Sequence, residues 1–321
     1  MKIFITGNLG FIGTHLSEYL IEKRHTLFGL DKKQLKSNEK YKCIQGNILD
    51  ANLLKESIND EIDLVIHLAA EHKDNVQPKS LYYDVNVKGT QNLVDACEIN
   101  NVKKIIFTSS VAVYGLDLVD SHENSTLKPF NDYGKSKLQA EKVLTEWYKK
   151  EKNRSLSIIR PTVVFGERNR GNVYNLMKQV AEKKFIMIGK GGNKKSIAYV
   201  GNLVNFISSS IKDTGYSVTN YADKPDLTMR QLIDLINNIL GNKENRWSIP
   251  YWFGISAGYI FDLLSFIFRR EFSISSIRIK KFCANSIINT DKLSQNNIQS
   301  VMLLQSAIER TIQYEKDTLS N

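Results

Sequence analysis

Apolar and polar blocks alternate along the first half of the chain in a pattern that predicts strands separated by helices. Short β-rich runs occupy residues 2–6, 25–31, 41–46, 63–70, 102–110 and 155–166. Between these runs, residues 11–23 and 80–100 show apolar positions at helical spacing. Strands that alternate with helices require right-handed crossovers and give a parallel sheet covered on both faces. We therefore expect an α/β fold with a Rossmann-type, doubly wound parallel sheet.

The length of the chain predicts a second, smaller lobe beside this sheet. A chain of 321 residues exceeds the size that one hydrophobic core usually serves. We assign residues 1–165 to a dinucleotide-binding domain, with a return segment near residues 196–225. Residues 166–321 are expected to form mainly a C-terminal lobe that binds substrate.

The first predicted strand runs directly into a glycine-rich turn, TGNLGFIG, at residues 6–13. Gly7, Gly10 and Gly13 allow a tight turn, a close approach to a diphosphate and packing of the next helix on the strand. The N-terminus of that helix favours negative charge. The next strand ends at Asp31, about twenty residues on, where a carboxylate binds the ribose hydroxyls and repels a 2′-phosphate. These residues predict NAD rather than NADP as the cofactor.

A candidate catalytic triad lies further along the chain. The sequence YGKSK at residues 133–137 begins a predicted helix that places Tyr133 and Lys137 on one face. A phenol is a weak base at neutral pH, but a neighbouring ammonium and a positively charged nicotinamide favour the phenolate. Ser110, at the end of a predicted strand, can hydrogen-bond the substrate oxygen. This arrangement predicts oxidation of an alcohol.

Three linked signals distinguish this triad from a solvated helix face, which is the commoner meaning of an isolated tyrosine and lysine at this spacing. The glycine turn, the strand-end serine and the YxxxK pair occur in the order and spacing of the extended short-chain dehydrogenase/reductase family of sugar epimerases and dehydratases. The chain resembles this family over nearly its whole length. The motifs that carry the resemblance are TGNLGFIG, HLAA, NVKGT, TSSVAVYG, YGKSK and RPTVVFG.

The resemblance implies a set of NAD contacts in the first domain. The implied contacts are Gly7, Gly10, Phe11, Ile12, Gly13, Asp31, Asn47, Ile48, Leu68, Ala69, Ala70, Asn86, Tyr133 and Lys137. Two positions depart from the family pattern. Asn47 stands where an aspartate usually lies near the adenine, and Val163 replaces an asparagine that many nucleotide-sugar epimerases use near the substrate.

The residues after Ser110 bear on the type of reaction. Dehydratases of the family carry an Asp-Glu pair there, because elimination of water needs an added acid and base. This chain has Val111 and Ala112 instead. Epimerisation or reduction of a keto group is therefore expected.

Four further stretches, 69–90, 166–180, 196–207 and 275–286, resemble family members that act in O-antigen assembly. That resemblance implies interconversion of GlcNAc and GalNAc on undecaprenyl diphosphate rather than on UDP. The alternatives are a soluble UDP-sugar 4-epimerase, an NAD(P)H-dependent 4-keto-sugar reductase and a non-catalytic dinucleotide sensor.

Substrate contacts are implied by the same pattern. Asn172 and Lys195 match positions that hold the substrate diphosphate, while Ser110 and Tyr133 would contact the sugar. Arg278 is a further candidate cation on the same grounds, since an anionic diphosphate is favoured by charge-assisted hydrogen bonds.

Residues 251–270 form a predicted amphipathic helix with a wide apolar face. Asp262, the glycines and the preceding Pro250 disfavour a membrane-spanning helix. Aromatic residues at headgroup depth and nearby basic residues suit a helix that lies in an anionic membrane surface. The alternatives are a core helix of the small lobe and a dimer contact.

The composition of the chain bears on its binding partners and its cellular location. The net charge of +10 predicts an acidic partner, but no nucleic-acid-binding motif accompanies it. The five histidines, His15, His25, His67, His72 and His122, lack metal-ligand spacing, so no metal is expected. With no signal-peptide pattern, we expect a cytoplasmic protein peripheral to the inner face of the cell membrane. The family resemblance also implies a homodimer formed through paired helices, with the helix that carries Tyr133 as the candidate.

Overall fold

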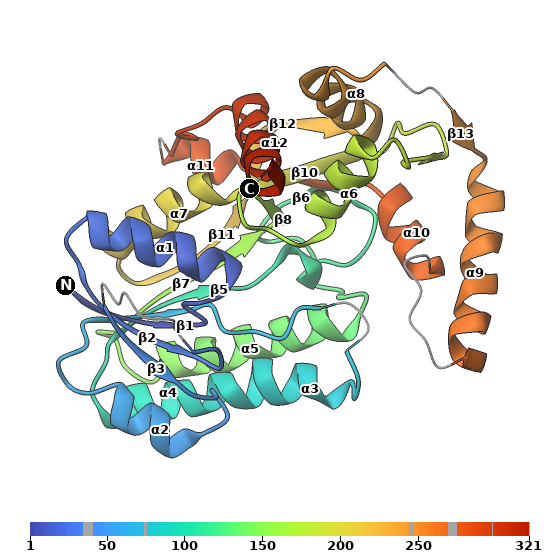
Figure 1. Ribbon diagram of the computed structural model, residues 1–321. Helices are drawn as coiled ribbons and strands as arrows, with labels where there is room; N and C mark the ends of the chain where they lie inside the picture. The colour runs from blue at the N-terminus through green and yellow to red at the C-terminus, as the bar shows by residue number, and fades with distance from the viewer. Residues whose placement is uncertain (35–40, 74–75, 244–246, 269–274, 297, 321) are drawn as a thin grey trace.

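The structure, a computed structural model, describes residues 1–34, 41–73, 76–243, 247–268, 275–296 and 298–320. A seven-stranded sheet forms the larger part of the molecule (Figure 1). In spatial order its strands are β11 (Tyr216–Tyr221), β7 (Ser155–Pro161), β5 (Lys104–Thr108), β4 (Leu64–His67), β1 (Lys2–Thr6), β2 (Thr26–Asp31) and β3 (Lys42–Gln45). All neighbouring pairs in it are parallel, so the predicted doubly wound sheet is confirmed.

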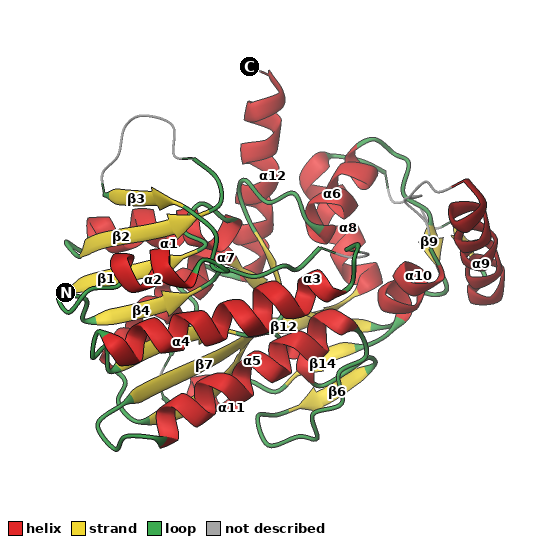
Figure 2. Ribbon diagram, turned by 90° about the horizontal axis from the view of Figure 1, so that it is seen from below, coloured by secondary structure: helices red, strands yellow, loops and turns green. Residues whose placement is uncertain are grey.

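Helices cover both faces of this sheet (Figures 1 and 2). One face carries α1 (Phe11–Glu22) and α7 (Val200–Ser209). The other carries α2 (Ala51–Ser57), α4 (Gly89–Ile99) and α5 (Asp132–Lys149). Side chains of each strand alternate between the two layers, as the pleat requires: Ile3 and Ile5 enter one core and Phe4 enters the other.

A second lobe contains a five-stranded sheet. Its path is β12 (Asp223–Thr228), β10 (Lys194–Tyr199), β14 (Ser286–Ile288) and β6 (Leu118–Ser121), and β8 (Val163–Phe165) also pairs with β10. A short pair, β9 (Met187–Ile188) with β13 (Ser248–Ile249), lies apart from it. The helices of this lobe are α6 (Asn172–Ala181), α8 (Met229–Leu240), α9 (Tyr251–Phe268), α10 (Ser276–Cys283), α11 (Asp291–Gln295) and α12 (Leu304–Ser320).

The chain passes between the two sheets more often than the sequence predicts. The run of residues 155–166 was expected to form one strand, but it divides after Pro161 into β7 of the large sheet and β8 of the small one. Proline has no N–H to donate to a ladder, which favours the end of a strand. Similarly, the expected helix at 80–100 consists of α3 (Ser80–Tyr83), a π-helical turn (Asp84–Lys88) and α4.

A buried ion pair fastens α5 to the sheet. Glu141 on α5 accepts hydrogen bonds from Arg160 on β7, with Nε to Oε1 at 2.9 Å and Nη2 to Oε2 at 2.6 Å. Ser109, just after β5, donates to the same carboxylate at 2.5 Å. The side chains of Arg160 and Glu141 are only 4% and 6% exposed. One carboxylate thus connects α5 with two neighbouring strands.

Loss of Arg160 should destabilise the protein strongly. In Arg160→Met the Glu141 carboxylate stays buried without its cation, so we expect a decrease of about 3–5 kcal/mol in the free energy of unfolding, measured with urea. As a control, Arg168→Met removes an exposed ion pair with Glu18 and should cost no more than about 1 kcal/mol. Equal losses in the two variants would contradict this role for the buried pair.

Candidate active site

The parallel strands bring their carboxyl ends to one edge of the large sheet. In the registers of β1, β4 and β5, Thr6 lies opposite His67, and His67 opposite Phe107. The glycine turn therefore lies beside residues 68–70 and close to the segment that contains Ser110. This edge is where open α/β sheets bind their ligands.

The glycine turn forms a tight cradle at the N-terminus of α1. Gly7 has a φ of +73°, and a Cβ added there would lie 2.8 Å from the backbone nitrogen of Ala69. A Cβ on Gly13 would lie 2.1 Å from the Gly7 carbonyl oxygen. At Gly10, in contrast, an added Cβ would meet the Gly7 oxygen at 3.1 Å and no other atom of the described segments within 4 Å, apart from its chain neighbours, so its outer side is open. Two glycines permit the packing, and the third leaves backbone accessible to a diphosphate.

Asp31 is held in place at the end of β2. Its Oδ2 accepts the backbone N–H of Leu9 at 3.1 Å, and its Oδ1 accepts that of Lys33 at 2.9 Å. The carboxylate is thereby fixed next to the glycine turn. A glycine turn with accessible backbone beside a fixed carboxylate fits the diphosphate and ribose of a dinucleotide.

Other implied cofactor residues divide into two groups. Phe11 and Ile12 begin α1, and Leu68, Ala69 and Ala70 follow β4, all partly exposed near the cradle. Asn47 and Ile48 follow β3, on the far side of β2.

Asn47 is exposed, whereas Ile48 is 4% exposed and packs beneath Gly89. Most of the Ile48 side chain therefore contributes to the hydrophobic core.

Asn86 links three segments of the protein. Its Oδ1 accepts the backbone N–H of Glu71 at 2.7 Å, and its Nδ2 donates to the Glu71 carbonyl at 3.0 Å and to Ser136 Oγ at 2.8 Å. Ser136 Oγ in turn donates to the Tyr133 carbonyl at 2.8 Å. The Asn86 amide thus holds the segment after β4 against the start of α5.

The structure brings Ser110 and Tyr133 together. Ser110 caps a short 3₁₀ helix (Val111–Val113), where its Oγ accepts the Ala112 N–H at 3.2 Å. The Ser110 hydroxyl lies close to the Tyr133 phenol and favours its ionised form. Burial has the larger effect and raises the pKa of Tyr133 above its ordinary value of 10.0.

Lys137 lies one helical turn after Tyr133 and is 3% exposed. Its Nζ donates to the Thr108 carbonyl at 2.7 Å and lies 4.4 Å from the centre of the Phe107 ring. Burial lowers the pKa of Lys137 to about 7, although the nearby Glu141 carboxylate favours the ammonium. Sequence reasoning expected the ammonium to favour a phenolate, but it neglected desolvation, which favours the neutral form of both groups.

Glu141 and Arg160 are two site residues that sequence reasoning did not single out. Their buried pair holds α5 in the position that places Tyr133 and Lys137 at the sheet edge. The spacing offered one signal, since Glu141 follows Lys137 by one helical turn and so lies on the same helix face.

The expected substrate residues lie in the second lobe. Lys195, on β10, donates to the carbonyls of Lys281 at 2.8 Å and Ala284 at 2.6 Å, and burial lowers its pKa to about 8. Asn172 is exposed at the first turn of α6, and Arg278 lies on α10. Lys195 and Arg278 thus come from neighbouring parts of the lobe, whereas Asn172 comes from a separate helix.

The buried His67 ring is held by two threonines. Thr6 Oγ1 lies 2.7 Å from its Nδ1, and Thr90 Oγ1 lies 2.9 Å from its Nε2. Burial lowers the pKa of His67 to about 3. Across the described ranges of the chain, no three histidine, cysteine or acidic side chains gather in a way that could hold a metal ion.

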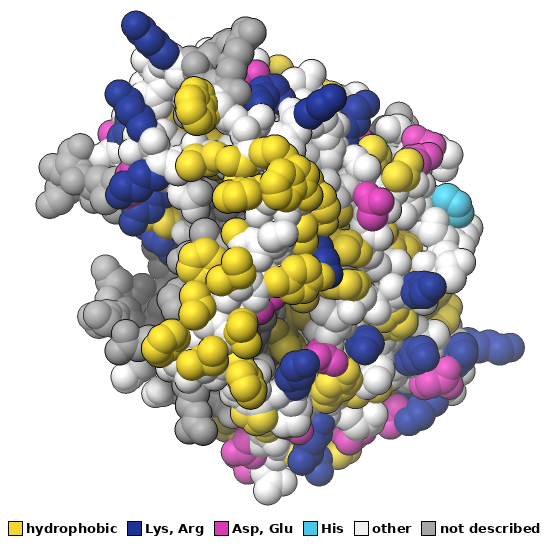
Figure 3. All heavy atoms as spheres, turned by 90° about the vertical axis from the view of Figure 1, so that its right-hand side faces the viewer, with side chains coloured by type: hydrophobic (Ala, Val, Ile, Leu, Met, Phe, Trp, Pro, Cys, Tyr) yellow, Lys and Arg dark blue, Asp and Glu magenta, His cyan; other side chains and the backbone are white. Residues whose placement is uncertain are grey.

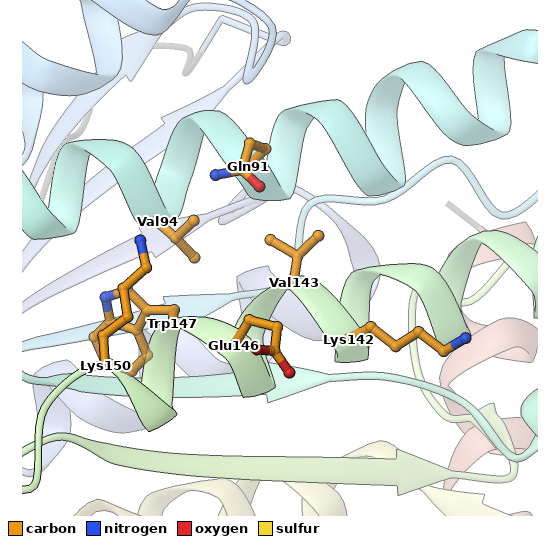
Figure 4. A pocket seen from close by; sticks show the side chains of 7 residues that line it. All are labelled: Gln91, Val94, Lys142, Val143, Glu146, Trp147 and Lys150. Atoms are coloured by element: carbon orange, nitrogen blue, oxygen red, sulfur yellow. The ribbon is translucent and has the colours of Figure 1, made fainter.

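A shallow hollow of about 280 Å³ lies between α4 and α5 (Figure 4). Gln91 and Val94 come from α4, Val143 and Glu146 are among those from α5, and Lys150 directly follows α5. None of the triad residues lines it. The hollow is therefore separate from the candidate active site.

Comparison with known proteins supplies a close relative in sequence. The chain is 49% identical over 317 residues to the N-acetyl-alpha-D-glucosaminyl-diphospho-ditrans,octacis-undecaprenol 4-epimerase of Escherichia coli O157:H7. This match covers 98% of the present chain and 95% of the relative.

Solved structures of more distant proteins share the fold. A UDP-glucose 4-epimerase from Thermotoga maritima, with UDP-glucose, has a TM-score of 0.79 at 21% identity, covering 99% of this chain and 100% of that one. A UDP-glucuronic acid 4-epimerase from Bacillus cereus, in complex with NAD, has a TM-score of 0.78 at 22% identity, covering 99% of each chain.

The family assignment rests on the greater part of the chain. Residues 3–219 match the model of the NAD dependent epimerase/dehydratase family. This stretch includes the glycine turn, Asp31, Ser110 and the YxxxK pair. The cofactor prediction of NAD agrees with this family. The chain therefore belongs to the NAD-dependent epimerase/dehydratase family, as its motifs predicted.

Proposed function

We propose that this protein is an NAD-dependent 4-epimerase that interconverts GlcNAc and GalNAc on undecaprenyl diphosphate, in the synthesis of O-antigen or another surface polysaccharide. The observation that carries the proposal is the 49% identity, over 98% of the chain, to a relative named for that lipid-linked substrate. The presence of Ser110, Tyr133 and Lys137 around one sheet edge supports a catalytic protein rather than a dinucleotide sensor.

Tyr133 acts in the proposed reaction as the base that removes the proton of the sugar 4-hydroxyl. Ser110 hydrogen-bonds the same substrate oxygen and orients it toward the phenol. Lys137 stabilises the phenolate once the substrate is bound and the positive charge of the cofactor ring is present beside it. The glycine cradle and Asp31 hold the cofactor, and NAD, when bound, supplies the acceptor and later the donor of hydride.

Inversion at C4 requires the keto sugar to present its other face before hydride would be returned to C4, with Tyr133 returning the proton to the C4 oxygen. The second lobe must therefore retain the diphosphate while the sugar turns. We assign this role to Lys195, with Asn172 and Arg278. Val111 and Ala112 provide no acid or base beside Ser110, so elimination of water is not part of the proposal.

A UDP-sugar 4-epimerase or a 4-keto-sugar reductase would use the same triad. The observation that favours a lipid-linked substrate is α9, whose apolar side chains face away from the protein (Figure 3). They include Trp252 (66% exposed) and Phe266 (83% exposed). Soluble monomers rarely expose a contiguous apolar surface of this kind without a partner. The alternative of a core helix is wrong for these side chains.

The narrow face of α9 is the part that contacts the lobe. A Cβ on Gly254 would lie 2.8 Å from Ile188 Cγ2, and one on Gly258 would lie 2.8 Å from Ser276 Cα. Asp262 accepts the Ser276 N–H at 3.2 Å. The glycines permit this contact, and the broad apolar face is left outside.

We infer that α9 lies in the membrane surface and that the protein is peripheral to the cytoplasmic face. Residues 251–268 have the length and apolar composition of a spanning helix, yet at about 1.5 Å per residue they reach only about 27 Å of a core about 30 Å thick. Lys280 lies 5.2 Å from the centre of the Tyr259 ring, so positive charge stands beside α9, which favours an anionic surface. Residues 269–270 of the predicted helix lie outside the described residues.

A homodimer through α5 stays a prediction. The outer faces of α4 and α5, with the hollow of Figure 4 between them, are the surface such a dimer would use.

The first prediction concerns substrate choice. The purified protein should convert GlcNAc-diphosphoundecaprenol to its GalNAc epimer and leave UDP-GlcNAc unchanged, without net consumption of NADH. Tyr133→Phe should lower the rate at least about a hundred-fold, since proton transfer typically contributes this much or more. Conversion of UDP-GlcNAc alone would favour the soluble epimerase, and stoichiometric use of NADH would favour the reductase.

The second prediction concerns the burial of Lys137. Its pKa is about 7 in the folded protein against an ordinary value of 10.5, so folding disfavours its proton. This cost is fully present below about pH 7 and disappears as the pH approaches 10.5.

Lys137→Met removes the cost and should abolish epimerisation. Its stability relative to the native protein, measured by urea unfolding, should therefore be greatest near pH 7 and should decrease toward pH 10. A stability difference that does not vary with pH would contradict the assigned burial.

The third prediction concerns the apolar face of α9. Phe266→Asp should weaken binding to liposomes that contain anionic lipid at least about ten-fold, because burial of a phenylalanine contributes about 1.5–3 kcal/mol. Ile99→Asp, at a similarly exposed apolar residue on α4, serves as the matched control and should bind normally. Unchanged liposome binding of Phe266→Asp, or a dimer that it disrupts in sedimentation, would contradict the membrane assignment.

A further inference from the structure

A cavity of about 520 Å³ lies between the active-site segment and α9. Three parts of the chain line it. Leu116 and Asp117 come from the segment that begins at Ser110, residues 188–193 form a second wall, and Tyr251 with the C-terminal part of α10 forms the third. Because Tyr251 is the first residue of α9, the cavity extends from the segment that carries Ser110 to the apolar helix.

The wall residues 188–193 include a glycine-rich loop with accessible backbone. Gly189 has a φ of +72°, and an added Cβ at either Gly189 or Gly192 would meet no atom of the described residues within 4 Å, apart from its chain neighbours. Lys190 in this loop and Lys280 opposite it supply two cations to the cavity. Open backbone and two ammonium groups suit a phosphate-bearing ligand.

The acidic residue of the cavity wall, Asp117, accepts hydrogen bonds from the protein. Asp117 Oδ1 accepts the backbone N–H of Asn285 at 2.8 Å and its Nδ2 at 3.3 Å. This carboxylate therefore opposes the two lysines less than a free one would.

The amides that line the cavity are committed to the protein as well. Asn193 Nδ2 donates to the carbonyls of Phe282 at 2.8 Å and Ala284 at 3.2 Å. Asn285 Oδ1 accepts the Lys194 N–H at 3.0 Å, while its Nδ2 is used by Asp117. These groups have little capacity to read the polar edge of a nucleotide base, which needs free donors and acceptors.

Resting on the function proposed above, we propose that this cavity binds the junction between the diphosphate and the first isoprene units of the substrate. Lys190, Lys280 and the glycine loop bind the phosphates together with Lys195, whose Nζ donates to the carbonyl of Ala284 in the cavity wall. The isoprene units lie against Ile188 and Tyr251 and continue along the apolar face of α9. The sugar can then reach Ser110 while the rest of the lipid stays at the membrane surface.

The test uses farnesyl diphosphate, which contains this junction but no sugar. We expect the full-length protein to bind it in equilibrium dialysis at least about ten-fold more tightly than UDP, inorganic pyrophosphate or farnesol. Cys283 lines the cavity and reports on the location of binding. Farnesyl diphosphate should slow its alkylation by N-ethylmaleimide, mapped by mass spectrometry, with Cys43 on β3 as the internal reference.

Two variants test the cavity wall itself. Gly192→Leu adds a side chain where the backbone faces open space, and Lys280→Met removes a cation. Each variant should weaken the binding of farnesyl diphosphate at least about five-fold. Lys152→Ala, an exposed lysine just before β7 at the opposite edge of the sheet, is the matched control and should bind normally.

Failure of this inference can be told apart from failure of the proposed function. Epimerisation of the lipid-linked sugar without binding of farnesyl diphosphate, or with both variants unaffected, would overturn the cavity assignment and leave the function intact. Tighter binding of UDP than of farnesyl diphosphate, with protection of Cys283 by UDP, would also overturn it. Cavity binding without epimerisation would support the assignment and contradict the function.

Discussion

The buried carboxylate of Glu141 is the contact on which the geometry of the candidate active site depends. It joins α5 to β7 through Arg160 and to the end of β5 through Ser109. Tyr133 and Lys137 are carried by α5, and Ser110 follows Ser109 directly. This one carboxylate thus fixes α5, with Tyr133 and Lys137, relative to the segment that carries Ser110. Its role also explains why a charged pair is retained in an interior where apolar side chains would pack at no desolvation cost.

The same burial that positions the triad opposes its ionised states. Desolvation raises the pKa of the Tyr133 phenol and lowers that of the Lys137 ammonium. The protein alone therefore holds a neutral phenol beside a lysine that readily loses its proton. A cationic cofactor ring and a bound sugar would alter this balance where the proton is transferred. Such sites trade stability for reactivity, because the charged forms that catalysis needs are disfavoured until the ligands are present.

The two faces of α9 in the second lobe have different roles. The narrow face of α9, with Gly254 and Gly258, packs closely on the protein, while its broad apolar face points away from it. The cavity beside Tyr251 connects this helix with the segment that begins at Ser110. A substrate with a polar head and a long apolar tail would match this sequence of surfaces. We therefore regard α9, the cavity and the triad as successive parts of one path.

The sequence alone determined the sheet, the glycine cradle, Asp31 and the helical spacing of Tyr133 and Lys137, because each depends on neighbours within about one helical turn or one strand. It also identified residues 251–270 as a helix with a wide apolar face. Tertiary structure decided which side of that helix faces outward, how Pro161 divides one apolar run between two sheets, and where the cavity lies. It also decided the direction of both pKa shifts. These properties arise from desolvation and from contacts between distant segments, which no local pattern records.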